Sequence, residues 1–282
     1  MNSIDTIYWI NLDRSVERYE RMTTMFKHPV FKNIKNIQRI QAYDGQDAKL
    51  IRSLIYNYDP SIDKFNKLTS KEYACVLSHF NAIRTYTLSS YTGYALIMED
   101  DMTLELYPYW QTSIDNALKN APSDWDIVQL AYMSPDMTGL LHPYRLYESN
   151  CGSFFSCGAY VIRKQSAIRF ISDHYISETD QYVFNKEDKD NLLTRHEADI
   201  YIYCSLKTYV YKYPFFIYGF TENTTLDHRT DHHDKSKITT IEIMIFEYNR
   251  KQSKKRYYIM LFICFCILLC INIITQLYDT LV

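Results

Sequence analysis

Short apolar runs alternate with helix-length segments through the first 211 residues of the chain. Runs typical of β-strands lie at residues 7–10, 37–42, 94–98, 125–130, 159–162 and 210–211. Segments typical of helices lie between them, at residues 15–27, 69–89, 163–174 and 198–207. The run at 94–98 is apolar throughout, as in a strand buried within a parallel sheet. Strands that alternate with helices along one chain predict an α/β fold.

The C-terminal segment departs from this alternation. Residues 257–274, YYIMLFICFCILLCINII, contain no charged side chain, and as a helix they would be roughly 27 Å long, close to the thickness of a hydrocarbon core. The basic segment RKQSKKR at 250–256 precedes them, and only Asp279 carries a charge after them. This pattern favours a transmembrane helix over a buried core helix. It predicts a tail-anchored, single-pass protein whose basic flank and globular part are cytosolic.

These patterns divide the chain into four parts. We expect a globular domain over residues 1–240, a basic juxtamembrane linker over 241–256, the transmembrane helix over 257–274 and a short tail over 275–282. Within the first part, the polar segment DHRTDHHDKSK at 227–237 is predicted to be a mobile loop.

Charge narrows the classes of partner. The 282 residues carry a formal charge of -2, but the basic flank holds five cations, so the first 249 residues carry about -6. A general nucleic-acid binder is therefore not expected. With 6 glycines in the chain, neither GxGxxG nor GxxxxGK[ST] occurs, so the familiar Gly-rich phosphate loops are excluded.

The cysteines agree with a cytosolic location. Cys75, Cys151, Cys157 and Cys204 form no CxxC pair, as is typical of a reducing compartment, and the three cysteines within 257–274 read as small apolar residues. The sequence also contains one sequon for N-glycosylation, Asn223-Thr224-Thr225, which would be used only if the domain lay on the other side of the membrane.

Three carboxylates, Glu99, Asp100 and Asp101, directly follow the buried strand at 94–98. Like charges this close repel one another, and burial raises the cost of ionising them. Ligands of open α/β sheets bind beyond the carboxyl ends of the strands, and Mg²⁺ and Mn²⁺ prefer carboxylate oxygens. The triplet therefore indicates a divalent cation that recruits a diphosphate, or else a solvated acidic turn.

Seven phrases together resemble glycosyltransferase family 25, which includes lipopolysaccharide-biosynthesis and collagen galactosyltransferases. They occur in the family's order and cover roughly residues 5–235. They are IYWINLDRSVER (7–18), RIQAYDG (39–45), LTSKEYACVLSH (68–79), ALIMEDDM (95–102), WDIVQL (125–130), CGAYVIRKQSAIRFI (157–171) and ADIYIY (198–203). The abundance of Tyr, Ile, Asn and Lys is similar to that of members encoded by large DNA viruses.

The resemblance implies a GT-A-like single domain with a Rossmann-like mixed sheet flanked by helices, a nucleotide-sugar donor and an inverting transfer. The acidic triplet matches the family's version of the DxD motif. Asp101 would ligate Mn²⁺ or Mg²⁺ on the donor diphosphate, with Glu99 and Asp100 near the ribose or the waters of the metal. Residues of the first strand and loop match those that hold the nucleotide, namely Asn11, Arg14 and Arg18. Their alternative role is a helix cap with surface arginines.

An inverting transfer needs a base for the acceptor hydroxyl, normally a carboxylate. Asp199 matches a late family motif and is the first candidate, and Asp126 is the second. His228 is the candidate third metal ligand, in competition with His232 and His233. His79 is expected to pack or to form hydrogen bonds within the fold.

The chain also departs from the family pattern. Tyr73 and Ser166 stand where Gly is common, and Glu197 stands where Pro often precedes the late motif. These departures put the acceptor side in doubt, while the acidic triplet is intact.

The main hypothesis is a membrane-anchored, cytosol-facing glycosyltransferase that uses a UDP-sugar and Mn²⁺ or Mg²⁺. It would transfer a hexose such as galactose to a glycan or protein hydroxyl. The competing hypothesis is a non-catalytic, membrane-tethered binding protein that retains the fold. A phosphoryl-transfer enzyme is disfavoured by the missing Gly-rich loops.

Overall fold

The computed structural model describes residues 1–58, 68–132, 145–184, 196–219 and 231–281. For residues 231–236 and 271–281 the description covers the backbone alone.

A seven-stranded mixed sheet forms the centre of the described structure, in the order β2-β1-β3-β7-β5-β10-β6. Its strands are β1 (Ile4–Asn11), β2 (Asn36–Gln41), β3 (Tyr94–Glu99), β5 (Ile127–Gln129), β6 (Tyr147–Ser149), β7 (Ala159–Ile162) and β10 (Thr208–Tyr211). β7 is antiparallel to both β3 and β5, and β6 is antiparallel to β10, while the remaining pairs are parallel. The strands β1, β3 and β5 therefore end, and β7 begins, at one edge of the sheet, which we call the carboxyl edge.

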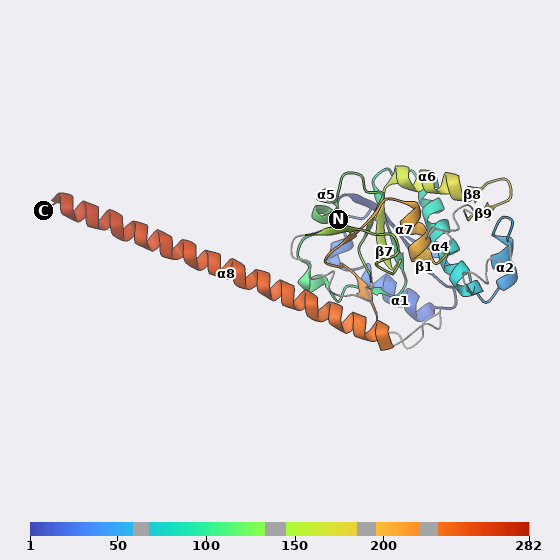
Figure 1. Cartoon of the computed structure of the whole chain (residues 1–282), viewed down its shortest axis with the longest axis horizontal. Helices are drawn as coiled ribbons and strands as arrows, with labels where there is room; N and C mark the ends of the chain where they lie inside the picture. The colour runs from blue at the N-terminus through green and yellow to red at the C-terminus, as the bar shows by residue number, and fades with distance from the viewer. Residues whose placement is uncertain (59–67, 133–144, 185–195, 220–230, 282) are drawn as a thin grey trace.

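Helices cover both faces of this sheet (Figure 1). One face packs against α2 (Ala48–Ser53), α4 (Ser70–Leu88), α6 (Lys164–His174) and α7 (Ala198–Ser205). The other face packs against α1 (Val16–Met25), the short helix η1 (Pro29–Phe31) and α5 (Ile114–Lys119). Side chains alternate accordingly, because successive residues of a strand point to opposite faces. In β3, for example, Ile97 joins the first cluster and Leu96 and Met98 join the second.

The long helix α4 begins at a capping box. The Thr69 side chain accepts a hydrogen bond from the backbone N–H of Glu72, and the Glu72 carboxylate accepts one from the backbone N–H of Thr69. The N-cap is therefore Thr69, the first residue of the predicted segment 69–89, and the helix itself begins at Ser70. His79 lies on the buried face of α4, together with Val76, Phe80 and Ile83.

Two further strand pairs and one short helix belong to the described residues of the globular part. β4 (Met102–Thr103) pairs with β11 (Ile217–Tyr218), and β8 (Tyr175–Ile176) pairs with β9 (Gln181–Tyr182). The short helix η2 (Tyr107–Tyr109) follows β4. Because β4 directly follows the acidic triplet, its pairing with β11 brings Tyr218 to the carboxyl edge.

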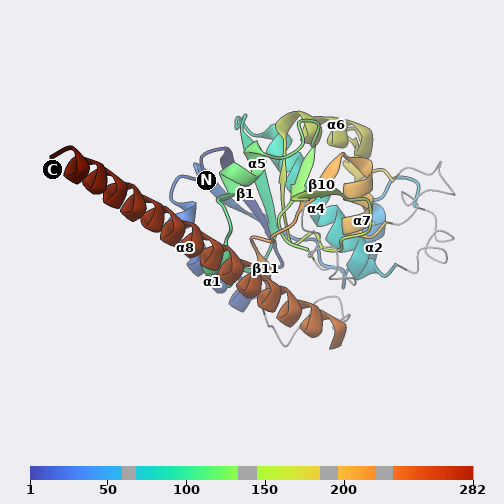
Figure 2. The same ribbon diagram turned by 60° about the vertical axis from the view of Figure 1, so that its left-hand side comes forward.

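The chain ends in one long helix, α8 (Asp231–Leu281). Its first part packs on the globular domain, where Met244 is buried against Leu106 of the η2 segment and Ile217 of β11. Farther along, α8 leaves the domain and stands alone in both views (Figure 1, Figure 2). From Tyr257 to Leu269 its large apolar side chains are exposed.

This helix changes three of the sequence predictions. The predicted loop at 227–237 is wrong over 231–237, which are helical, while 227–230 lie outside the described residues. The predicted linker at 241–256 is part of α8. No helix in the part of the chain that the structure describes is long and apolar enough to cross a membrane, so the predicted transmembrane segment is not supported.

The predicted α/β class is confirmed, with a mixed sheet between two layers of helices. A strand lies in every predicted apolar run, although β5 occupies only half of the run at 125–130, and β1 and β3 pair in parallel within the sheet.

Candidate active site

The acidic triplet lies at the carboxyl edge, as the strand pattern predicted. Glu99 is the last residue of β3, and Asp100 and Asp101 form the turn that leads into β4. Asn11 ends the neighbouring strand β1, which pairs in parallel with β3. The parallel register therefore brings the first-strand motif and the triplet together, although 89 residues separate Asn11 from Asp100.

Asp100 is clamped by protein groups on both carboxylate oxygens. Asn11 Nδ2 donates to Oδ2 at 2.6 Å, and Arg18 Nη1 donates to Oδ1 at 2.8 Å. Arg21, one helical turn after Arg18, donates to the Asp100 backbone carbonyl at 3.2 Å. Charge-assisted hydrogen bonds of this kind are about twice as strong as neutral ones. Asp100 thus fixes the turn and ties α1 to the end of β3.

Asp101 has a different environment. Its Oδ1 atom is buried and has no hydrogen-bond partner among the described residues, while Oδ2 lies 3.7 Å from Arg18 Nη1. Burial, followed by repulsion from Glu99 and Asp100, raises the pKa of this carboxyl well above its usual range, although the two nearby arginines oppose the shift. The backbone carbonyl of Asp101 accepts a hydrogen bond from Gly219 at 2.7 Å, which fixes the residue against the end of β11.

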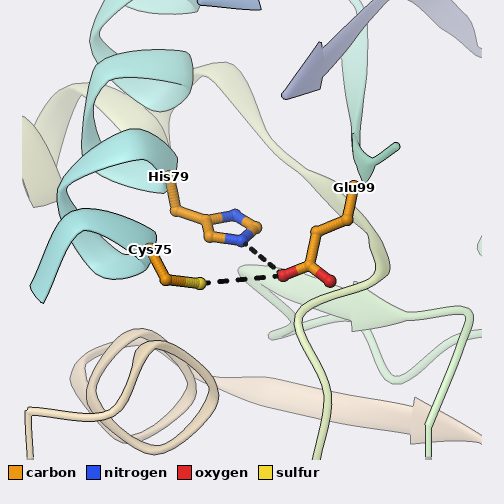
Figure 3. Close-up of side chains that lie close together, drawn as sticks. All are labelled: Cys75, His79 and Glu99. Carbon is orange, nitrogen blue, oxygen red and sulfur yellow. Dashed lines mark hydrogen bonds and ion pairs between the residues drawn. The ribbon is translucent and has the colours of Figure 1, made fainter. Parts of the chain in front are cut away.

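Glu99 faces the buried side of α4 (Figure 3). Its Oε1 atom lies 3.1 Å from Nε2 of His79 and 3.9 Å from Sγ of Cys75. The other ring nitrogen of His79 lies 3.3 Å from the hydroxyl of Tyr160 on β7. His79 is buried and hydrogen-bonded, as predicted, and it orients the first carboxylate of the triplet.

Asp199 is held beside the same edge by the segment before β7. Its Oδ2 accepts the backbone N–H of Ser156 at 2.8 Å, and its Oδ1 accepts that of Ile200 at 3.0 Å. Burial raises the pKa of this carboxyl, and the charges of Glu197 and Glu99 add to the shift, while the two N–H groups oppose it. A buried carboxyl with a raised pKa has the property required of a general base that works near neutral pH.

Ser156 holds Asp199 from a strained backbone. Its φ is 101°, in the region that L-residues rarely adopt. Its carbonyl accepts hydrogen bonds from Gln129 and Tyr203, both at 2.9 Å, and its hydroxyl lies 2.5 Å from that of Tyr218. These contacts offset the strain and aim the Ser156 N–H at Asp199.

The structure does not bring the other predicted residues to this cluster. Asp126 precedes β5 and so lies at the opposite edge, where Ser166 and Arg169 donate to it, each at 2.6 Å, and the Lys207 backbone N–H donates at 3.0 Å. Those hydrogen bonds hold the pKa of Asp126 below its usual range, which suits a structural carboxylate and not a base. Ser166, a departure from the family pattern, thus has a partner of its own.

Arg14 pairs with Asp44 at 3.3 Å on the surface. His228, His232 and His233 lie outside the residues whose side chains are described. The sequence reasoning did not identify Arg21, Ser156 and Tyr218. Only Arg21 had a sequence signal, namely its position one helical turn after Arg18.

A disulfide bond contradicts the prediction of reduced cysteines typical of a cytosolic protein. Cys151 and Cys204 are joined at an S–S distance of 2.04 Å across a sequence separation of 53, so the prediction of unpaired cysteines is wrong for these two. Cys75 and Cys157 are free, as predicted. The bond connects two parts of the site. Cys151 lies in the segment that precedes Ser156, and Cys204 lies on α7, the helix that carries Asp199. Disulfides persist in oxidising compartments, so the cysteines no longer support a cytosolic location.

The residues at the carboxyl edge fit a hard divalent cation. Asp101 offers a buried carboxylate oxygen without a partner among the described residues, and the repulsion within the triplet would be relieved by a positive charge. Asp101 would be the first protein ligand, with Glu99 beside it. Asp100 is not available to the ion, because both its oxygens are engaged.

Comparison with known proteins places these residues in a family. Residues 4–189 match the model of glycosyltransferase family 25 (LPS biosynthesis protein), a stretch that contains the acidic triplet but ends before Asp199. None of the curated proteins compared with the chain matches it.

Three solved structures show a distant likeness. Protein A197 from STIV is 9% identical, with a TM-score of 0.36 over 76% of this chain and 83% of that one. An active-site mutant of LgtC is 8% identical, with a TM-score of 0.29 over 84% of this chain and 94% of that one. The galactosyltransferase LgtC in complex with donor and acceptor sugar analogs is also 8% identical, with a TM-score of 0.29 over 85% and 95%. At such scores these structures carry no argument here. The family match, by contrast, extends over more than half of the 282 residues, and it shows that the chain belongs to glycosyltransferase family 25.

Proposed function

We propose that this glycosyltransferase has a GT-A-type site and transfers a hexose, such as galactose, from a UDP-sugar to a hydroxyl group of a glycan or glycoprotein, with Mn²⁺ or Mg²⁺ bound at Asp101. The observation that carries the proposal is the Asp101 Oδ1 atom, buried and unpartnered within the described structure, beside two further carboxylates at the carboxyl edge. Three carboxylates this close repel one another, and a cation at Asp101 that also binds a diphosphate would offset that cost.

Each group at the edge has a distinct task in such a transfer. When bound, the cation would offset the negative charge that develops on the departing nucleoside diphosphate. Asp101 holds the ligand oxygen in place, because its backbone is fixed by Gly219. Asn11 and Arg18 act through Asp100, whose clamp keeps the turn from moving when the charge at the edge changes. Preorganised groups of this kind need no rearrangement during the reaction.

Asp199 is the base of the proposed mechanism. The acceptor hydroxyl gives its proton to the carboxylate of Asp199 while its oxygen attacks the anomeric carbon. Two features support this role: burial raises the pKa of the Asp199 carboxyl, and the charge of Glu99 adds to that shift. The Ser156 N–H keeps one oxygen oriented.

We also infer that the exposed end of α8 attaches the protein to a membrane. Its large apolar side chains between Tyr257 and Leu269 are 47% to 67% exposed, and the basic segment 250–256 precedes them. Such a surface is costly in water, and basic residues favour an anionic lipid surface. Fractionation of the full chain and of residues 1–256 tests this, since only the full chain should sediment with membranes.

The side of the membrane is a separate question with its own test. The basic segment favours a cytosolic domain, whereas the Cys151–Cys204 disulfide favours an oxidising compartment. Protease treatment of sealed vesicles distinguishes the two, because a domain enclosed in the lumen is protected until detergent is added.

The activity test uses the purified full chain with a panel of UDP-hexoses, with and without Mn²⁺. We expect donor turnover only with the cation, and loss of turnover in Asp101→Asn. The matched control is Asp173→Asn, which changes an exposed aspartate on α6 and should keep full activity. At 100 times its Kd the cation should also stabilise the protein by about 2.7 kcal/mol.

The outcomes separate the alternatives. Full activity of Asp101→Asn would contradict the metal assignment. Donor binding without turnover in the wild type would instead support the non-catalytic binding protein.

A further inference from the structure

We propose that Cys75, His79 and Glu99 form a second metal site, for a Zn²⁺-class ion, behind the acidic triplet. Their ligand atoms all lie within 4.8 Å of one another, and the three residues come from only two elements, α4 and the end of β3 (Figure 3). Glu99 also stands beside the cation proposed at Asp101, but the two sites differ in their other ligands, which here are a thiol and an imidazole. This inference does not rest on the proposed function.

The spacing of the ligands follows from the helix. Cys75 and His79 are four residues apart on α4, so both side chains lie on one face, one turn apart. That face packs against β3, whose last residue is Glu99. A helix pair at i and i+4 with a third ligand from a neighbouring element is a common way to hold Zn²⁺.

Two of the three ligand separations lie near those around a tetrahedral ion. With metal bonds of about 2.0 Å to nitrogen or oxygen and about 2.3 Å to sulfur, tetrahedral geometry separates N from O by about 3.3 Å and S from O by about 3.5 Å. In the structure, Nε2 of His79 lies 3.1 Å from Oε1 of Glu99, and Sγ of Cys75 lies 3.9 Å from the same oxygen. These separations differ from the ideal by about 0.2 Å and about 0.4 Å, and the sulfur and nitrogen atoms lie within 4.8 Å of each other.

A further contact supports the site. A metal-bound imidazole normally uses its other ring N–H in a hydrogen bond that fixes the ring. In His79, Nε2 faces Glu99 and Nδ1 faces the Tyr160 hydroxyl at 3.3 Å. With Nε2 on the metal, the Nδ1–H would donate to Tyr160, and the ring would need no reorientation.

The ligand set also selects the ion. A thiolate, an imidazole and a carboxylate suit Zn²⁺ and Co²⁺, whereas Mg²⁺ and Mn²⁺ prefer oxygen ligands alone. On binding, the S–H bond of Cys75 breaks, the S–metal bond forms, and the proton passes to the buffer. The divalent ion, one thiolate and one carboxylate then sum to zero charge, which keeps the cost of a buried cluster low. Three protein ligands leave a fourth position for water or for a ligand.

The test is a titration of the metal-free, full-length protein with Co²⁺ alone. The three exposed cysteines of α8, Cys264, Cys266 and Cys270, are replaced by serine in every sample, so that they cannot bind the ion. We expect one cobalt per chain with the near-ultraviolet charge-transfer band of a cobalt–thiolate bond, release of about one proton per ion, and loss of the band when Zn²⁺ is added.

Variants assign the ligands. Cys75→Ser should abolish the thiolate band, and Glu99→Gln should weaken cobalt binding at least about tenfold. Cys157→Ser is the matched control, since it removes a buried thiol that is not in the cluster, and the cobalt–thiolate band should persist in this variant. Tyr160→Phe should weaken cobalt binding by about tenfold, because it removes the hydroxyl that orients the ring of His79. Thermal unfolding confirms that each variant is folded.

Two results would overturn the proposal: no stoichiometric thiolate band in the wild type, or a band that survives Cys75→Ser. Asp101→Asn should leave the cobalt band unchanged, and Mn²⁺ should not displace cobalt. Failure of this site and failure of the cation site at Asp101 are therefore observed separately.

Discussion

Reduction of the Cys151–Cys204 disulfide should destabilise the globular domain strongly. The bond closes a loop with a sequence separation of 53. In the chain-entropy description, a loop of this length removes about 14 cal/mol/K from the unfolded state, which corresponds to about 4 kcal/mol at 25 °C. For a domain of this size, about 2–4 °C is lost per kcal/mol, so the unfolding temperature should fall by about 8–16 °C.

The assay compares thermal and urea unfolding with and without a reductant, for the wild type and for the double variant Cys151→Ser/Cys204→Ser. The reduced wild type and the double variant should unfold alike. The reductant should have no effect on the double variant, which makes that variant the control for side effects of the reductant. Intact mass should confirm the bond in the oxidised wild type, which should be 2 Da lighter than the reduced chain.

If reduction of the disulfide lowered the free energy of unfolding by less than about 1 kcal/mol, the reasoning would be refuted. It would mean that the native state gains nothing from the closed loop, either because the bond does not form or because the unfolded chain is already compact there.

Four further predictions concern the two edges of the sheet. Asn11→Ala removes a hydrogen bond to the buried carboxylate of Asp100. The free energy of unfolding, measured in urea, should therefore fall by about 1.5–3 kcal/mol. In Asp126→Asn, the free energy of unfolding should fall by about 2 kcal/mol in the same measurement. The kcat of this variant should stay unchanged, because Asp126 and its partners lie at the opposite edge of the sheet. A large loss of kcat would instead support Asp126 as the base. Because the Asp199 base must be ionised and burial raises its pKa, kcat/KM should rise with pH through that raised pKa, and a flat profile would contradict the assignment. The folded state holds this proton more tightly than the unfolded state, so the Asp199 contribution to stability falls as pH rises from about 3.8 through the folded pKa, and Asp199→Asn should remove that slope.

Local sequence patterns predicted the centre of the fold and one side of the site. The all-apolar run before Glu99 identifies β3, and the position of the carboxylates after that run places them at the edge where strands end. The same pattern did not exclude Asp126, because the predicted strand at 125–130 contains it. The structure begins β5 at Ile127, so Asp126 precedes the strand and lies at the opposite edge.

The remaining features depend on contacts between distant segments. Nothing near Cys151 in the sequence indicates Cys204 as its partner, because only the fold closes that separation. The clamp on Asp100 likewise requires the parallel register of β1 and β3. The left-handed backbone of Ser156 had no signal, since such positions are usually read from Gly or Asn.

The continuity of α8 sets a working distance for the enzyme. Lys251, still on the domain, donates to the Gln111 carbonyl at 3.1 Å, and the exposed apolar surface begins six residues later at Tyr257. Six helical residues span only about 9 Å, and a continuous helix does not bend like a flexible tether. With its apolar end in a bilayer, the domain would be held close to the lipid surface and in one orientation. Hydroxyl groups presented near that surface, as on a glycolipid or a membrane glycoprotein, would then be within reach, and free soluble glycans would have no such advantage.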